Sequence, residues 1–287
     1  MGKLRTYGIW MILTISTLIF LYPDLKQAQL KQKAEKVTEY GEAYYEKMIT
    51  YNQKLLEDGQ NLADCWNYEQ EYDFTAGSEA VGEIRIEALE LELPLYLGAT
   101  GENMAKGAAV LAQSSMPVGG ESTNCVIAAH RGYSGLPFFR QIDELKPGDK
   151  VELINARETL QYVVERMEII LPTDLACLEI QEGRDLVTLI SCHPYMGGGR
   201  FRYVVYCKRN QIEESVPAEP DTETNEVKVS AEILENMQMM EELEKVEQHI
   251  PFTFQREEEI RRGLYVIFML VWIWMIAEHI RTRRRRG

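Results

Sequence analysis

The chain has 287 residues, of which 45% are hydrophobic and 26% are charged, and its formal net charge is -14 at pH 7. This composition excludes a low-complexity or wholly disordered chain and allows one good hydrophobic core with accessory segments. The negative charge argues against a nucleic-acid partner, because binding to a phosphate backbone needs clustered Lys and Arg side chains. We therefore expect one catalytic domain flanked by smaller segments.

Two apolar stretches lie near the ends of the chain. Residues 7–22 follow Lys3 and Arg5, and residues 264–277 precede the basic run 281–286. Each stretch is somewhat shorter than the ~20 residues that an untilted membrane span prefers, and flanking Trp and Tyr side chains can extend it through the interface. Because Lys and Arg mark the cytoplasmic side, we expect a cell-membrane protein with both termini in the cytoplasm and its catalytic domain outside.

Each apolar stretch has an alternative interpretation. The first could be a cleaved signal peptide, which also has a charged start and an apolar middle, but no convincing small-x-small cleavage site follows Tyr22. The second could be a buried helix of a soluble domain. Its two Trp residues, its uncharged length and the arginines behind it favour a membrane span instead.

The segment after the first stretch is predicted to be helical. From Leu25 to about Gln60, apolar residues recur at spacings near three and four among Lys, Glu and Gln. The dipeptide Asp58-Gly59 should end this helix, because Gly is common just past a helix C-terminus. A loop of mixed character is expected to follow, as far as Gly77.

The middle of the chain changes to the period of β-structure. Alternating or continuous apolar runs are separated by turn signals such as Gly119-Gly120 and Pro147-Gly148-Asp149. Strands are expected over Val81–Ile86, Leu91–Leu97, Asn124–Ala129, Lys150–Ile154, Gln161–Ile170, Asp185–Ser191 and Arg202–Cys207. So many short strands with little helix predict a mainly β domain, either a barrel or a sandwich.

The expected organisation has five segments. After Arg209 the sequence becomes acidic and contains prolines, which is typical of a linker, and residues 230–248 carry apolar groups at helical spacing. The predicted division is an N-terminal membrane anchor (1–24), a helix and lid segment (25–80), the β domain (81–209), an acidic linker with a helix (210–262), and a C-terminal transmembrane helix with a basic cytoplasmic tail (263–287).

The cysteines point to a free thiol rather than to a metal. The five cysteines form no C-x-x-C pair and have no spacing suited to zinc. An odd number in an exported chain leaves at least one of them unpaired. We expect no metal and no cofactor, and a free thiol is a candidate nucleophile.

Three polar residues lie at the ends of predicted strands. His130 directly follows one apolar run, Cys192 follows another, and Arg202 directly precedes a third. If the last two strands are antiparallel neighbours, the end of one and the start of the next lie at the same edge of the sheet. A thiol that gives its proton to an imidazole becomes the attacking thiolate, and a guanidinium can stabilise the oxyanion that forms when a carbonyl is attacked.

Each of these residues has a competing interpretation. Cys192 could be a buried structural thiol, although Cys125 and Cys177 suit that role better. His193 adjoins Cys192 and competes with His130 as the base. If the strand continues through His193, its side chain points to the opposite face from Cys192.

The three elements together resemble the sortase family. Residues 188–192 (TLISC) resemble the sortase motif T-L-x-T-C with Ser in place of the second Thr, residues 119–124 and 129–132 resemble the stretch that leads to the sortase histidine, and residues 202–205 resemble the arginine and strand that follow the cysteine. The resemblance covers about residues 80–208. It implies an eight-stranded β-barrel that cuts a sorting signal of the Leu-Pro-x-Thr-Gly kind through a thioacyl intermediate and passes the acyl group to an amine.

The resemblance also implies roles for individual residues. His130, Cys192 and Arg202 correspond to the catalytic three, and Arg200 is an alternative arginine of the same strand parity. The flanking segments resemble class C sortases, the pilin polymerases. Their lid carries an Asp-Pro-aromatic motif, which residues 64–66 match with Cys65 in place of Pro, so that Asp64 and Trp66 would cover the catalytic groove.

The resemblance leaves the acceptor open. A pilin polymerase would use the lysine amine of a pilin, whereas a wall-anchoring sortase would use a cell-wall precursor. A simple hydrolase and a non-catalytic membrane-anchored binding module are further possibilities. The expected partners are therefore pilin or surface-protein sorting signals, an amine acceptor and the membrane.

Overall fold

The computed structural model describes residues 2–35, 41–62, 79–133, 136–195, 199–210, 228–229, 263, 266, 269, 271–274, 277 and 281. The chain divides into two compact units, Met1–Ile233 and Leu234–Gly287. The first unit holds a β-barrel and two long helices. In the second unit, the described residues from 263 to 281 are helical.

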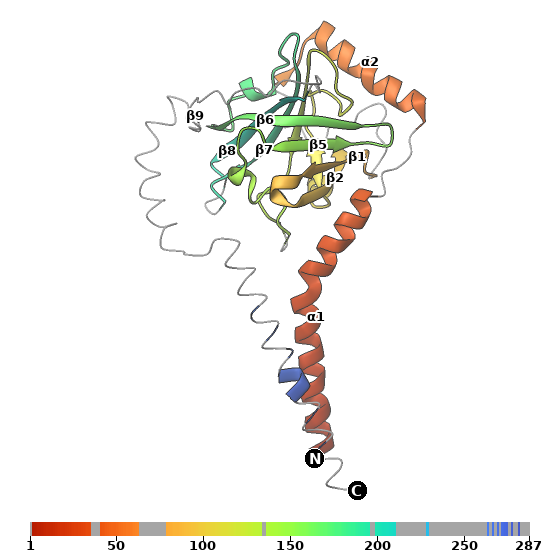
Figure 1. Ribbon diagram of the computed structural model, residues 1–287, viewed down its shortest axis with the longest axis vertical. Coiled ribbons are helices and arrows are strands. Elements are labelled where there is room, and N and C mark those ends of the chain that lie inside the picture. The colour runs from red at the N-terminus through yellow and green to blue at the C-terminus, as the bar shows by residue number, and fades with distance from the viewer. Residues whose placement is uncertain are drawn as a thin grey trace. The chain divides into compact units, whose positions relative to one another are not determined.

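The barrel consists of eight strands that close on themselves (Figure 1). In chain order the strands are β1 (Gly82–Ile86), β2 (Leu91–Leu97), β3 (Ala108–Val110), β4 (Thr123–Ala128), β5 (Lys150–Ile154), β6 (Thr159–Ile170), β7 (Asp185–His193) and β8 (Phe201–Arg209). Their spatial order is β5-β1-β2-β3-β4-β7-β8-β6, and pairing between β5 and β6 closes the circle. A two-residue strand, β9 (Lys228–Val229), adds to β6 in parallel.

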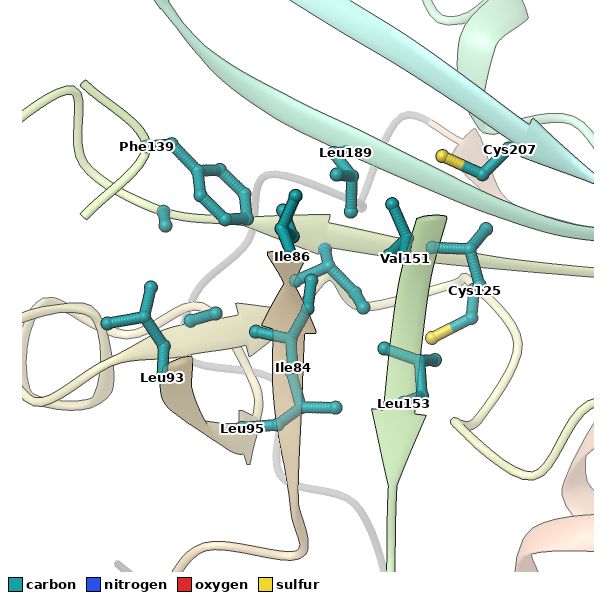
Figure 2. Close-up of a cluster of buried hydrophobic side chains, with 14 of the residues drawn as sticks. Ile84, Ile86, Leu93, Leu95, Cys125, Phe139, Val151, Leu153, Leu189 and Cys207 are labelled. Carbon is teal, nitrogen blue, oxygen red and sulfur yellow. The ribbon is translucent and has the colours of Figure 1, made fainter. Parts of the chain in front are cut away.

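Side chains from alternate positions of the strands fill the barrel. Figure 2 shows Ile84 and Ile86 of β1, Leu93 and Leu95 of β2 and Val151 of β5 directed toward one another. Further members of the same core come from β4, β7 and β8 and include Cys125, Leu189 and Cys207. Removal of these apolar side chains from water supplies the main driving force for barrel closure.

A second apolar cluster, which we call the outer cluster, lies on the outer face of β4, β7 and β8. Its members from those strands include Ala128, Ile190 and Val204, and the short helix η4 (Ala176–Leu178) adds Cys177 and Leu178. Asn124 fastens η4 to the barrel: its Nδ2 donates to the carbonyl oxygens of Cys177 (3.1 Å) and Glu179 (3.0 Å). Strands β4 and β7 are therefore buried on both faces of the sheet, which agrees with their near-continuous apolar runs.

Two helices precede the barrel. Helix α1 (Gly2–Glu35) ends near β2, where Leu30 and Ala34 are buried and Lys31 pairs with Glu92 at 2.8 Å. Helix α2 (Glu42–Asp58) buries Met48 in the barrel core. Asn52 of α2 accepts a hydrogen bond from the backbone N–H of Met116 at 2.7 Å.

The sequence-based expectations agree with most of these elements. The seven expected strands appear as β1, β2 and β4–β8, and α2 ends at Gly59, whose φ of 82° favours glycine. The three-residue strand β3 was not expected, because Ala108 to Val110 is too short to show a period. Pro94 is tolerated in β2 because pairing with β3 begins only at Leu95.

The expectation of one helix from Leu25 to Gln60 was wrong. Helix α1 continues upstream through the first apolar stretch, and Gly41 is extended at φ -64° and ψ 158°, so α2 starts as a separate helix. Glycine destabilises a helix interior by about 1 kcal/mol relative to alanine, which explains why the helix stops there although the apolar period continues past it.

Several sequence-based predictions are not tested by the described residues. The expected helix over 230–248 and the lid residues Asp64, Cys65 and Trp66 lie outside them. Within the described part of the chain, no helix has both the length and the apolar character needed to cross a bilayer. The two transmembrane helices and the five-segment division therefore remain predictions.

Candidate active site

One end of the barrel gathers the three residues singled out from the sequence. Strands β7 and β8 are antiparallel, and Cys192 lies directly opposite Arg202. Strand β4 runs parallel to β7 with Ala128 opposite Ile190, and the N–H of Ala129 donates to the carbonyl of Ile190. The strand pairing ends at this pair, and the same register continued for two more residues would bring His130 beside Cys192.

Side-chain parity puts Cys192 and Arg202 on the outer face of the sheet. Ala128, Ile190 and Val204 belong to the outer cluster, and within their strands Cys192 lies two residues after Ile190 and Arg202 lies two residues before Val204. His130 lies two residues after Ala128, just beyond the end of β4, and continued strand parity would put it on the same face.

Cys192 is the accessible thiol among the cysteines that the structure describes. Cys125, Cys177 and Cys207 are buried, whereas Cys192 is partly exposed. Burial raises the pKa of the Cys125 and Cys207 thiols, which keeps them protonated. A nucleophile must be both accessible and able to lose its proton, so the described geometry favours Cys192 over these structural cysteines.

Gly199 closes the space next to the sulfur. A Cβ atom at this position would lie 3.1 Å from Cys192 Sγ and 3.9 Å from Arg202 Nη1, and the backbone φ of 62° also favours glycine. The strand before the cysteine is tied to the β4 end by Ser191, whose hydroxyl donates to the carbonyl of Ala129 at 2.8 Å. The sulfur therefore has a close backbone wall on one side and a fixed strand behind it.

His130 is partly buried between aromatic rings. Its ring stacks on Tyr133 with centroids 4.8 Å apart and planes 19° apart, and the edge of Phe138 meets it at 6.4 Å. Burial lowers the pKa of His130. A lowered pKa keeps more of the imidazole neutral at pH 7, which is the form that accepts a proton.

Arg202 differs from Arg200 in its position and contacts. The Nη1 of Arg202 donates to the carbonyl oxygens of Gly199 (2.7 Å) and Phe201 (2.9 Å), which holds the guanidinium at the catalytic end. Arg200 is exposed and lies before β8 begins at Phe201. The register thus favours Arg202 as the cation opposite Cys192.

His193 lies on the inner face of the sheet. Strand β7 continues through His193, so its ring points away from the side of Cys192, and its Nδ1 lies 3.0 Å from Nη1 of Arg131. Burial first, and then the charge of Arg131, lower the pKa of His193 to about 4. A guanidinium can only donate, so Nδ1 is the acceptor and His193 is neutral at pH 7.

Arg131 is a site-shaping residue that the sequence analysis did not single out. It is buried, forms an ion pair with Asp143, and its Nε donates to the carbonyl of Arg140 at 3.0 Å. Its Nη1 also reaches the carbonyl of Cys192 at 3.5 Å. Its position directly after His130 was the one available signal, because its partners are distant in sequence.

Metal ligation has no support in the described residues, which contain no group of three or more His, Cys, Asp or Glu side chains placed to hold an ion. The chemistry that the site offers is nucleophilic. A thiol, a neutral imidazole and a fixed guanidinium on one face can form and resolve a covalent acyl intermediate.

Known proteins with the same features form one family. The family model described as a sortase domain matches residues 84–210. The crystal structure of Streptococcus pneumoniae sortase C is 30% identical, covers 66% of this chain and 100% of its own, and has a TM-score of 0.55. Sortase C1 of Streptococcus agalactiae is 29% identical, covers 65% of this chain and 98% of its own, and has a TM-score of 0.56.

Characterised relatives extend the match. Sortase A of Bacillus anthracis is 29% identical over 210 residues, which are 71% of this chain and 95% of that protein. Sortase D of Bacillus subtilis is 27% identical over 133 residues, and the match spans 46% of this chain and 64% of that protein. With the closed barrel and the register of its catalytic end, these matches show that the chain belongs to the sortase family of cysteine transpeptidases, and within it to class C.

Proposed function

We propose that this chain cleaves a sorting signal of the Leu-Pro-x-Thr-Gly kind and joins the released acyl group to a lysine amine of a pilin subunit, so that it assembles pili. The observation that carries the proposal is the register that sets Cys192 opposite Arg202, with His130 directly beyond the end of the neighbouring strand β4. The solved structures of class C relatives add support, since that of the Streptococcus pneumoniae enzyme bears on pilin substrate specificity.

The first half of the proposed reaction forms a thioester. His130 takes the proton of Cys192, and the thiolate sulfur attacks the carbonyl carbon of the threonine in the signal. Arg202 stabilises the negative charge on the carbonyl oxygen. The C–N bond to the glycine then breaks, and His130 returns the proton to the leaving amine.

The second half resolves the thioester. The neutral amine of the acceptor attacks the same carbonyl carbon, Arg202 again stabilises the oxyanion, and the sulfur leaves as a thiolate. The proton of the attacking amine passes to His130. The product is an isopeptide bond if the acceptor is a lysine, or a link to the wall if the acceptor is a cell-wall precursor.

Mass spectrometry tests the covalent step. Incubation with a sorting-signal peptide should add the mass of the acylated fragment to the protein, and Cys192→Ala should abolish the adduct. A Cys177→Ser variant is the matched control, because Cys177 is buried in the outer cluster and should leave the adduct intact. No adduct with the wild-type protein would favour a non-catalytic binding module.

The acceptor is tested separately. Purified pilin should give a ladder of covalent multimers if lysine is the acceptor. An active enzyme that forms no ladder but conjugates an amine analogue of a wall precursor would point to wall anchoring. A rate that is unchanged by added amine, with water as the acceptor, would indicate a hydrolase.

We also propose that the segment with Asp64, Cys65 and Trp66 is a lid over the catalytic groove. Support comes from its two ends, because Leu62 and Ala80 both pack against the outer cluster, which contains Ile190 of the strand that carries Cys192. Gln60 fixes the first end through hydrogen bonds with Leu178 and Ile180. Trp66→Ala should raise the rate at which a thiol reagent modifies Cys192, and an unchanged rate would contradict a lid formed by Trp66.

For localisation, we propose a membrane-held enzyme with its barrel outside the cell. The support is the sequence pattern of two apolar stretches with basic outer flanks at residues 7–22 and 264–277. Membrane fractionation of the full chain, followed by protease treatment of intact cells, tests it. The barrel should be cut or shed while both termini stay protected, and recovery in the soluble fraction would contradict the proposal.

A further inference from the structure

The ring of His130 is held by aromatic contacts. Tyr133 covers one face in a near-parallel stack, and Phe138 meets the ring edge-on with planes 83° apart. Tyr133 and Phe138 also contact each other, with centroids 6.4 Å apart. These separations lie in the range that favours attractive pairs of aromatic rings. The two ring contacts restrict the orientation of the His130 imidazole.

Backbone hydrogen bonds fix the loop that carries these rings. Tyr133 and Leu136 exchange backbone hydrogen bonds of 3.0 and 2.9 Å, and the N–H of Phe139 donates to the carbonyl of His130 at 3.0 Å. Phe138 is 2% exposed yet has a φ of 44°, a left-handed conformation that bulky residues rarely adopt. Backbone strain of this kind persists where the surrounding structure requires it, often at functional sites.

Resting on the proposed function, we propose that Tyr133 is a positioning residue for His130: it holds the imidazole plane toward Cys192 and stabilises the imidazolium that forms when the thiol gives up its proton. The Tyr133 side chain is 44% exposed, so it can be substituted without disturbing the core. Phe138, which is buried, supplies the fixed edge.

The stack has two physical consequences. A flat ring against the imidazole restricts rotation about the last side-chain bond, so the nitrogen that faces the sulfur stays in place. The face of a tyrosine ring also carries negative charge density and attracts a cation. Among the described residues, the ionisable groups on the outer face include Cys192 on β7 and Arg202 on β8, and Tyr206 and Cys177 of the outer cluster. A substitution at Tyr133 leaves all four of these side chains in the chain.

Three variants of the full chain separate this role from simple packing. Tyr133→Leu removes the ring and keeps apolar bulk, and Tyr133→Phe keeps the ring. Tyr195→Leu is the matched control, because Tyr195 is 46% exposed and stacks on Arg140 at 4.9 Å rather than on His130. NMR titration of His130 in a Cys192→Ala background reports its pKa without the thiol, and turnover of a sorting-signal peptide reports catalysis.

We expect Tyr133→Leu to lower the pKa of His130 by about half a unit, whereas Tyr133→Phe and Tyr195→Leu leave it unchanged. In turnover, Tyr133→Leu should lower kcat about tenfold with little change in KM, because a misplaced base affects the chemical step. An unchanged or raised pKa in Tyr133→Leu would overturn the proposal. If the pKa falls as expected but no variant acylates the peptide, the stack stands and the proposed function fails.

Discussion

Two histidines lie at the ends of neighbouring strands and differ in their surroundings: His130 follows β4, and His193 is the last residue of β7. On the outer face, His130 has aromatic neighbours and shares its side of the sheet with Cys192 and Arg202. On the inner face, His193 accepts a hydrogen bond from Arg131, which also forms an ion pair with Asp143. Burial lowers the pKa of both rings, and that of His193 falls to about 4. The proposed mechanism assigns the proton exchange with the sulfur to His130, because His193 lies on the other face and contacts Arg131.

On the proposed assignment, the residue nearest in sequence is not the catalytic partner. His193 is adjacent to Cys192, whereas His130 lies 62 positions before it. The pleat of β7 sends neighbouring side chains to opposite faces, and the parallel pairing of β4 with β7 ends two residues before His130. Variants on each face test whether catalysis depends on the outer face alone.

The largest expected effect separates the two histidines directly. His130→Gln should lower kcat/KM for a sorting-signal peptide by about 10³-fold, the usual contribution of a positioned acid or base. His193→Gln keeps an acceptor for Arg131 and should stay close to the wild-type rate. Steady-state kinetics measure both variants. A comparable loss of kcat/KM in His193→Gln would contradict the proposal that only the outer-face histidine takes part in catalysis.

The next effect separates the two arginines. Arg202→Ala should lower kcat by about 10²- to 10³-fold, because it removes a charge aimed at the developing oxyanion. Arg200→Ala should change kcat little, since Arg200 is exposed and precedes β8. Circular dichroism of both variants controls for folding. The reverse ranking would transfer the role to Arg200.

A smaller effect is expected at Gly199, whose backbone lies next to the Cys192 sulfur. Gly199→Ala would place a Cβ 3.1 Å from Cys192 Sγ at a left-handed φ, so it should destabilise the local loop by about 1–3 kcal/mol. The thiol should then react more slowly with a small alkylating reagent. Gly148→Ala is the matched control, because Gly148 also has a positive φ but meets nothing within 4 Å. Equal alkylation rates in the two variants would show that Gly199 does not crowd the sulfur.

The smallest effect concerns pH and the inner face. The pKa of His193 is about 4 in the folded chain and should be near 6.5 when unfolded, so between these values the unfolded state binds more protons. Stability should therefore fall as pH drops from about 6.5 to 4, by on the order of 1 kcal/mol from this residue. Denaturant unfolding of wild type and His193→Gln measures it. Parallel pH curves for the two would show that His193 contributes nothing.

Much of the fold was readable from local patterns. The seven longer strands were predicted because burial on one or both faces leaves an apolar period in the sequence. The closed barrel matches the solved class C structures, as the resemblance implied. Strand β3 was missed since three residues carry no period, and Gly41 interrupted a helix whose apolar spacing continued on both sides of it.

The candidate site was predicted in part for the same reason. Cys192, His130 and Arg202 stand at the ends of apolar runs, and three ordered elements resembled one family. Their catalytic roles remain predictions, as do those of Asp64 and Trp66. Arg131 escaped notice because its role depends on Asp143 and His193, which only pairing of β4 with β7 and folding of the intervening loop bring to it.

The sequence by itself determined which segments become strands, which residues stand at their ends, and which family the chain resembles, because these properties depend on neighbours along the chain. Only the tertiary structure decided the partner of each group: which arginine lies opposite the thiol, which histidine turns inward, and which rings hold the other histidine. Those outcomes depend on strand register and side-chain parity between segments that are distant in sequence, and no local pattern encodes the register of two strands that are not joined by a turn.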